Sequence, residues 1–155
     1  MSQTILIKAV VTDILRLHIL MQGGGSAIRA KTYRVFHKHN VNIVKDEIVA
    51  WALESTALLG CTPCTLAIGI GRSHFEATAL MTEAQVYGAF GIQCEIENEI
   101  TERVNKLGVG VLGLGGNTTI LASFIRIGMQ RASGVRIVCM RPCCCFEPRI
   151  ECTEL

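Results

Sequence analysis

Apolar residues recur along this chain at two spacings, which predicts both strands and helices. Short runs rich in β-branched residues predict strands over 4–11, 14–21, 66–70 and 135–139. Helical spacing predicts helices over 42–59, 75–87 and 95–107, the second capped by Ser73 and the first ended by Gly60. A further apolar run, 120–127, is expected to pack in the core. These patterns predict an α/β fold with a mixed sheet and flanking helices, formed by residues 1–155 as a single domain.

Composition narrows the classes of protein to consider. Half of the 155 residues are hydrophobic and 18% are charged, so the chain is expected to fold around a core. The formal net charge of +2 and the aromatic content of 5% do not favour nucleic-acid binding. Residues 107–125 carry no charge, but their glycines and polar Asn117, Thr118 and Thr119 favour a buried segment over a membrane span. We therefore expect neither nucleic acid nor membrane as a partner.

The cysteines are the strongest chemical signal. The first seven residues lack the pattern of a secretory leader, so the thiols are expected to be reduced in the cytoplasm. Metal or iron–sulfur binding is the best use for clustered thiolates. Cys143, Cys144 and Cys145 cannot all bind one centre, because neighbouring side chains of an extended segment diverge. The C-x-x-C of Cys61 and Cys64 is compatible with a redox pair, a metal site or chance. The eight cysteines are Cys61, Cys64, Cys94, Cys139, Cys143, Cys144, Cys145 and Cys152.

Two glycine-rich stretches are candidates for anion binding. Residues 107–119 read LGVGVLGLGGNTT, and glycine lets backbone N–H groups turn to one side and approach a ligand. A tight turn between two buried elements is the commoner use of such a stretch. The second is GGGS at 23–26, which a flexible hairpin loop explains equally well.

The remaining polar candidates are histidines and the end of a strand. His37 and His39 form an H-x-H pair that can bind metal from a strand, although a solvated surface pair is the commoner case. His74 opens a predicted helix and is expected at the surface. Residues 141–145 follow the predicted strand 135–139, where sites of α/β proteins gather.

Taken in order, four segments resemble the catalytic α region of class I, iron–sulfur-dependent fumarases and tartrate dehydratases. GGGS at 23–26 resembles the family's substrate loop, and GCTPCTLAIGIGR at 60–72 resembles its cysteine-proline-proline and glycine strand. LGVGVLGLGGNTT at 107–119 resembles the family's LGIGPQGLGGKTT, and CCCFEPR at 143–149 resembles its last cluster-cysteine segment. The resemblance covers about residues 14–149.

This resemblance implies a hydro-lyase that reversibly dehydrates a small hydroxy dicarboxylic acid such as malate or tartrate. It implies a [4Fe-4S] cluster held by three cysteines, with one iron open to act as a Lewis acid. The middle cluster cysteine corresponds to Cys61, with Cys64 as second choice. The last corresponds to Cys143 or Cys145, depending on where the count begins. Substrate donors are implied at Gly23, Gly24, Gly25, Ser26, Gly115, Gly116, Thr118 and Thr119.

Three departures from the family pattern qualify the prediction. The family's first cluster cysteine belongs to a CQDTG segment upstream of the glycine loop, so the chain resembles only the second half of the α region. The family's acid/base histidine falls at or beside Arg131, and arginine binds carboxylates but carries protons poorly. Thr62 and Pro63 replace a proline pair.

The chain is therefore expected to need the missing N-terminal α segment, a β-type hydro-lyase chain, or both, in an oligomer. Two alternatives remain: a noncatalytic or degenerate fragment of the fold, and a thiol-based redox or metal-binding protein.

Overall fold

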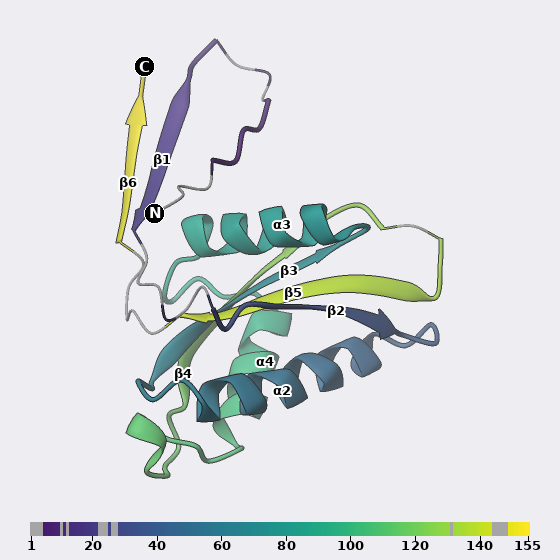
Figure 1. Ribbon diagram of the computed structural model, residues 1–155, viewed down its shortest axis with the longest axis vertical. Coiled ribbons are helices and arrows are strands. Elements are labelled where there is room, and N and C mark those ends of the chain that lie inside the picture. Colours follow the sequence, from purple (N-terminus) through teal and green to yellow (C-terminus); the bar gives the residue numbers. More distant parts are fainter. Residues whose placement is uncertain are drawn as a thin grey trace.

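The computed structural model describes residues 5–9, 11, 13–21, 25, 28–130, 132–143 and 149–155. Strands open and close the described chain, and the helices lie between β2 and β4 (Figure 1). The main elements in chain order are β1 (Arg16–Met21), β2 (Lys31–Phe36), α2 (Val41–Ala57), β3 (Cys64–Gly71), α3 (His74–Tyr87), α4 (Glu95–Asn105), β4 (Ile120–Ile127), β5 (Val135–Cys143) and β6 (Arg149–Glu154). The predicted α/β class is confirmed.

The main sheet has the strand order β2-β5-β3-β4. β3 runs parallel to β4 and antiparallel to β5, and β5 is also antiparallel to β2, so the sheet is mixed, as predicted. β3 is buried along its whole length because helices cover both of its faces. α3 covers one face, and α2 with α4 covers the other (Figure 1).

Successive residues of β3 point to opposite faces of the sheet, so this strand packs against the helices on both sides. Leu66 and Ile68 contribute to the larger core, which α2 and α4 complete with Ile48 and Ile100. Gly69 faces α3 on the opposite side, where a Cβ atom would lie 2.0 Å from the carbonyl oxygen of Ala77. Glycine at this position therefore lets the backbone of α3 pack directly on the strand.

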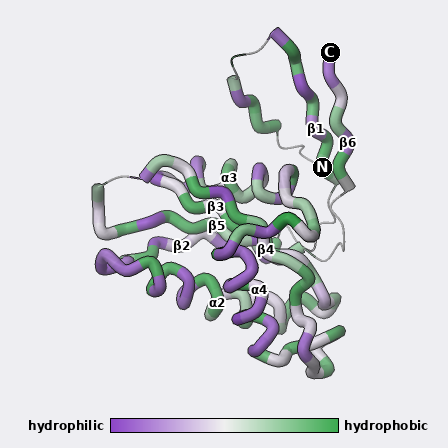
Figure 2. The backbone as a smooth tube through the Cα atoms, turned by 180° about the vertical axis from the view of Figure 1, so that it is seen from behind, coloured by the Kyte–Doolittle hydropathy of each residue, from purple (hydrophilic) through white to green (hydrophobic). Residues whose placement is uncertain are grey.

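A two-stranded antiparallel sheet, β1 with β6, projects away from the main sheet (Figure 1). Leu17, Ile19 and Met21 on β1 are exposed. The tube of this sheet carries several hydrophobic segments (Figure 2). It meets the body near the end of α3, where the Tyr87 hydroxyl lies 3.2 Å from Nε2 of His18.

Several predicted boundaries differ from the structure. The helices begin or end within two residues of the predicted positions, and the Ser73 hydroxyl caps α3 by accepting from the Glu76 amide at 3.1 Å. The predicted strand at 4–11 is wrong for the residues described there, because 5–9 and 11 pair with no strand; instead, Lys8 binds Glu83 on α3 at 3.1 Å. β5 does not stop at Cys139 but continues to Cys143, since β3 pairs with it over that length.

The expectation of a solvated histidine pair is wrong for His37. This ring is buried, with 8% of its surface exposed. Its Nε2 donates to the carbonyl of Ser133 at 2.8 Å, while its Nδ1 accepts from the amide of His39 at 3.0 Å. The ring therefore connects two loops in place of binding a metal ion.

In the described part of the chain, no helix is long and apolar enough to cross a membrane.

Candidate functional site

The topology gathers three predicted site segments at one end of the main sheet. β3 and β4 begin at this end because they are parallel, and β5 ends there because it is antiparallel to β3. Cys64 pairs with Ile120 at the start of β4, and Thr65 pairs with Cys143 at the end of β5. We call this region the cysteine end of the sheet: the turn 60–64, the glycine loop 108–119 and Cys143.

Thr62 connects the cysteine turn to the glycine loop. Its side chain is buried, and its hydroxyl donates to the carbonyl of Gly110 at 2.5 Å and accepts from the amide of Gly113 at 3.2 Å. Its backbone carbonyl accepts from the amide of Leu112 at 3.0 Å. One threonine therefore satisfies three backbone groups of the loop, which orders it beside Cys61.

The glycine loop folds back on itself. Gly110 and Gly115 form an isolated bridge, and a Cβ atom on Gly110 would lie 2.0 Å from the carbonyl oxygen of Gly115. Gly110 also has φ of +69°, which favours glycine. The two halves of the loop can approach this closely only because position 110 has no side chain.

Of the substrate donors implied in this loop, Gly115, Gly116 and Thr118 are exposed at the cysteine end. Thr119 is fully buried. Its hydroxyl accepts from the amide of Gly110 at 3.1 Å, and its carbonyl accepts from the amide of Cys64 at 3.2 Å. Thr119 therefore supports the loop from inside, while the other three positions face solvent.

Asn105, the last residue of α4, fixes the entry to β4. Its Oδ1 accepts from the amides of Thr119 and Ile120 at 2.8 and 2.9 Å, and its Nδ2 donates to the carbonyl of Ile120 at 3.1 Å. The helix end and the strand start are thereby held together, which positions the exposed part of the loop.

The two described cysteines of the implied ligand set have different surroundings. Cys61 is exposed, and its Sγ lies 3.5 Å from the carbonyl of Leu59. Cys143 is buried, and its Sγ accepts from the side-chain amide of Gln85 at 2.9 Å. Cys64 is fully buried in the larger core, which favours Cys61 over Cys64 as an accessible ligand.

These thiols fit a cluster site in kind but not in number. Iron–sulfur clusters are held by cysteine thiolates. Within the described residues, however, no group of three His, Cys, Asp or Glu side chains is arranged to hold a metal ion. Of the cysteines that the resemblance implies as ligands, the structure describes Cys61 and Cys143.

Some predicted site residues lie outside the described residues: Gly23, Gly24, Ser26, Arg131 and Cys145. Gly25 is described, and the position of its absent Cβ is open space. The sequence analysis did not identify Asn105 or Gln85. Gln85 was detectable in principle, because it interrupts the apolar stripe of α3 beside Ala84 and Met81.

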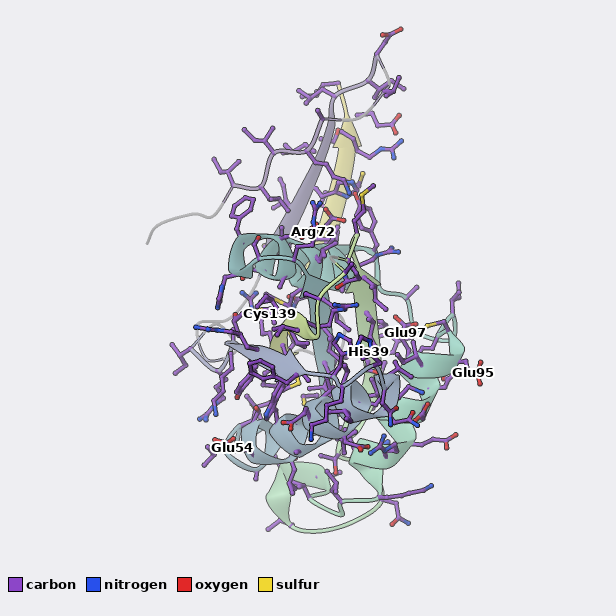
Figure 3. All side chains as sticks on the ribbon, turned by 90° about the vertical axis from the view of Figure 1, so that its right-hand side faces the viewer. His39, Glu54, Arg72, Glu95, Glu97 and Cys139 are labelled. Atoms are coloured by element: carbon purple, nitrogen blue, oxygen red, sulfur yellow. The ribbon has the colours of Figure 1, made fainter. Side chains whose placement is uncertain are left out.

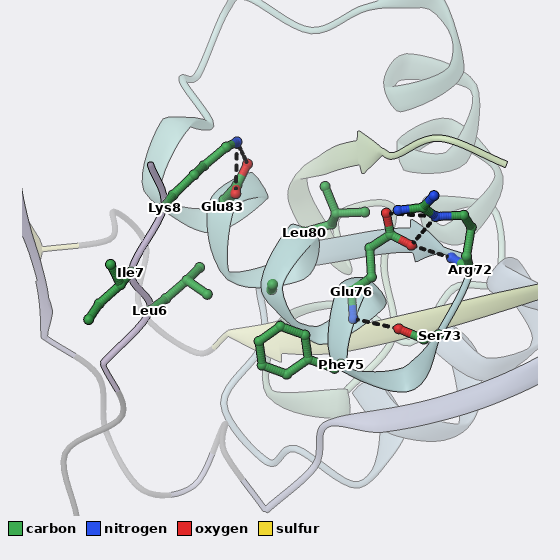
Figure 4. A pocket seen from close by; sticks show the side chains of 10 residues that line it. Leu6, Ile7, Lys8, Arg72, Ser73, Phe75, Glu76, Leu80 and Glu83 are labelled. Atoms are coloured by element: carbon green, nitrogen blue, oxygen red, sulfur yellow. Dashed lines mark hydrogen bonds and ion pairs between the residues drawn. The ribbon is translucent and has the colours of Figure 1, made fainter. Parts of the chain in front are cut away.

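A groove of about 590 Å³ lies over the first part of α3 (Figure 4). It begins at Arg72, which follows the last residue of β3, whereas Cys64 is the first residue of that strand. Glu76 binds Arg72 in its wall and raises the pKa of that guanidinium. None of the cysteines that the structure describes lines this groove, and neither does the glycine loop.

Comparison with known proteins gives a consistent assignment. The family model described as fumarate hydratase (Fumerase) matches residues 3–153. A putative L(+)-tartrate dehydratase subunit alpha of Methanocaldococcus jannaschii is 38% identical over 106 residues, which are 61% of this chain and 37% of that protein. The L(+)-tartrate dehydratase subunit alpha of Escherichia coli K12 is 22% identical over 140 residues, which are 84% of this chain and 45% of that protein. The chain thus spans less than half the length of these curated relatives. Because the family model covers nearly all of the sequence, the chain belongs to the fumarate hydratase (Fumerase) family.

Proposed function

We propose that this chain forms part of a hydro-lyase that reversibly dehydrates a small hydroxy dicarboxylic acid such as malate or tartrate. One observation carries the proposal: in a chain of the fumarate hydratase family, Cys61, the glycine loop and Cys143 meet at one end of the sheet. These segments lie far apart in the sequence, and their proximity in the fold supports the proposal.

Cys61 and Cys143 would be thiolate ligands of a [4Fe-4S] cluster, with Cys145 as the alternative to Cys143. When bound, such a cluster would supply a Lewis acid for a carboxylate and the departing hydroxyl group of the substrate. Cys61 lies in the turn that Thr62 fixes to the glycine loop, and Cys143 ends a buried strand. Both positions are held by backbone structure, as a preorganised ligand set requires.

The exposed part of the glycine loop would bind one carboxylate of the substrate. Gly115 and Gly116 allow close approach, and the Thr118 hydroxyl can donate to an anion. Such donors stabilise the negative charge that develops when a proton leaves the neighbouring carbon. Gly23, Gly24, Gly25 and Ser26 are proposed as further donors, and Arg131 as a partner of the second carboxylate.

A partner chain would complete the site. The relatives are named alpha subunits, and this chain spans less than half of their length. We therefore propose that a β-type chain, further α-type sequence, or both supply the remaining cluster cysteine and the acid/base group. The resulting enzyme would be an oligomer.

The test is anaerobic reconstitution with iron and sulfide, alone and with a candidate β-type chain, followed by iron quantitation and electron paramagnetic resonance. We expect a cubane-type signal in the wild type that is lost in Cys61→Ser and Cys143→Ser. Cys94→Ser is the matched control for Cys61→Ser, because Cys94 is also exposed but is the N-cap of α4. Malate and tartrate dehydration assays follow on the reconstituted samples.

Absence of a cluster in every preparation would overturn the iron–sulfur part of the proposal. Stoichiometric zinc in its place would favour the thiol-based metal-binding alternative. Neither metal nor dehydratase activity would favour a noncatalytic member of the family.

A further inference from the structure

The small sheet of β1 and β6 has little to stabilise it within the described part of the chain. Figure 3, like Figure 1, shows it projecting away from the main sheet. There β1 pairs with β6 alone, and Leu17, Ile19 and Met21 of β1 are exposed. Isolated pairs of strands are marginally stable in water, and further strands or a packed apolar face are needed to stabilise them. The small sheet therefore calls for a partner.

The edge of β1 that is turned away from β6 presents a defined row of backbone groups. Leu15 and Leu155 exchange two backbone hydrogen bonds, of 3.2 and 2.9 Å, and so form a hydrogen-bonded pair. Such pairs alternate along an antiparallel ladder, so every second residue from Leu15 onward turns its N–H and C=O groups toward β6. The residues between them turn the same groups to the other side: Arg16, His18 and Leu20.

The two edges of the small sheet differ in charge. β1 has the sequence RLHILM, in which Arg16 is the only charged residue and is bound by Glu154 of β6. β6 has the sequence RIECTE, and its Glu151 and Glu154 are exposed. Charged side chains on an edge strand oppose the pairing of a further strand, whereas an uncharged edge is a template for one. A partner strand is therefore expected along β1 and not along β6.

We propose that β1 pairs with β1 of a second copy of this chain, antiparallel and about a two-fold axis at His18. Because both copies present the same uncharged edge, the surface is self-complementary, as a two-fold interface requires. In this register Arg16 lies opposite Leu20 of the second copy, so all outward-facing backbone groups of the two strands are paired. The two Arg16 side chains lie at opposite ends of the paired strands, which avoids like-charge repulsion. On the exposed face, Leu17 becomes the neighbour of Ile19 of the second copy.

This assembly closes at two copies. It contains a four-stranded sheet with the order β6-β1-β1-β6, whose two outer edges both carry the exposed Glu151 and so oppose further growth. Four strands with an apolar face reach the size at which small sheets become stable. The paired residues belong neither to the cysteine end nor to the other positions of the candidate site, so the pairing is independent of the proposed hydro-lyase activity.

The first arm of the test is sedimentation velocity of the full chain over a range of concentrations. Leu20 and Ile150 pair directly across β1 and β6, and the amides of both face outward, so proline at either position leaves the hydrogen bonds between β1 and β6 in place. We expect a wild-type dimer whose dissociation constant rises about tenfold or more in Leu20→Pro and stays unchanged in Ile150→Pro. A monomeric wild type, or equal effects of the two prolines, would overturn the inference.

The second arm needs no variant and follows amide hydrogen exchange in the wild type. As the protein concentration rises, we expect exchange to slow at Arg16, His18 and Leu20 but not at Cys152 and Glu154, whose amides face outward on the other edge. Exchange that is equally fast at both edges and independent of concentration would contradict the pairing. Slow exchange along β1 in a sample that sediments as a monomer would show that another segment of the same chain covers this edge, which would also overturn pairing with a second copy.

Discussion

The hydroxyl of Thr62 donates a hydrogen bond to the carbonyl oxygen of Gly110 at 2.5 Å, across 48 residues of sequence. This bond joins the turn that carries Cys61 to the loop proposed to bind the substrate. Thr62 stands where the family resemblance leads one to expect proline, which has no hydroxyl to donate. In this chain, a side-chain hydrogen bond therefore holds together two parts of the candidate site.

Replacing Thr62 by valine should destabilise the protein by about 1–3 kcal/mol. Valine keeps the shape but leaves the Gly110 carbonyl and the Gly113 amide without this partner. Urea unfolding followed by circular dichroism measures the change. Hydrogen exchange of the Gly113 amide should accelerate in the same variant.

Thr62→Ser is the control for the hydroxyl. It removes one methyl group and keeps the donor and acceptor, so it should cost less than Thr62→Val and preserve slow exchange at Gly113. Equal losses in the serine and valine variants would contradict a hydrogen-bonding role and indicate that packing alone matters.

Alanine should be tolerated very differently at two glycines of the same loop. Both have positive φ, +69° at Gly110 and +72° at Gly113, but only at Gly110 would a Cβ atom meet backbone, at 2.0 Å from Gly115. Gly113→Ala should therefore cost about 1 kcal/mol for its backbone conformation, and Gly110→Ala should cost at least twice as much. Thermal unfolding of both variants tests this, and a smaller loss for Gly110→Ala would show that the loop adopts another path.

The sequence predicted the elements that local physics determines. The helix over 75–87 was recognisable because Ser73 can cap it. The strand around Leu66 was recognisable because it is a short run of apolar residues. The extent of β5 was not recognisable, since Arg141–Cys143 join the strand only by pairing with β3. Likewise, the burial of His37 depends on a loop nearly a hundred residues away.

For the candidate site, sequence motifs located Cys61, the glycine loop and Cys143 but not the residues that hold them. Asn105 and Gln85 act across the fold on partners that no local pattern connects to them. Thr119 shows the converse: its motif suggested substrate contact, whereas its side chain is buried under the loop. Motifs therefore indicate chemistry, and packing decides which members of a motif face solvent.

Asn105→Ala should destabilise the protein by about 2 kcal/mol, because the amides of Thr119 and Ile120 lose a shared acceptor. Asn105→Asp keeps that acceptor and loses only the donation to the Ile120 carbonyl, so it should cost about half as much. Denaturant unfolding gives the comparison. If aspartate were as damaging as alanine, the two accepted bonds would not be the main contribution of Asn105.

The ion pair between α2 and α4 should make stability depend on acid pH. Lys45 hydrogen-bonds Glu99 and, together with Arg103, holds the pKa of that carboxyl below its usual range. A carboxyl whose pKa is lower in the folded state stabilises the protein above its unfolded pKa of about 4.3, and this contribution is lost as the pH falls through the folded value. Wild type should therefore be more stable than Glu99→Gln at pH 7, with the difference vanishing as Glu99 is protonated.

Unfolding by urea at a series of pH values between 3 and 7 measures this difference, and added salt should reduce it because the pair is partly exposed. Glu102→Gln, on the exposed side of the same helix, is the control for a general loss of negative charge. A difference between wild type and Glu99→Gln that stayed constant down to pH 3 would mean that Glu99 contributes through packing of its side chain against α2 and not through its charge.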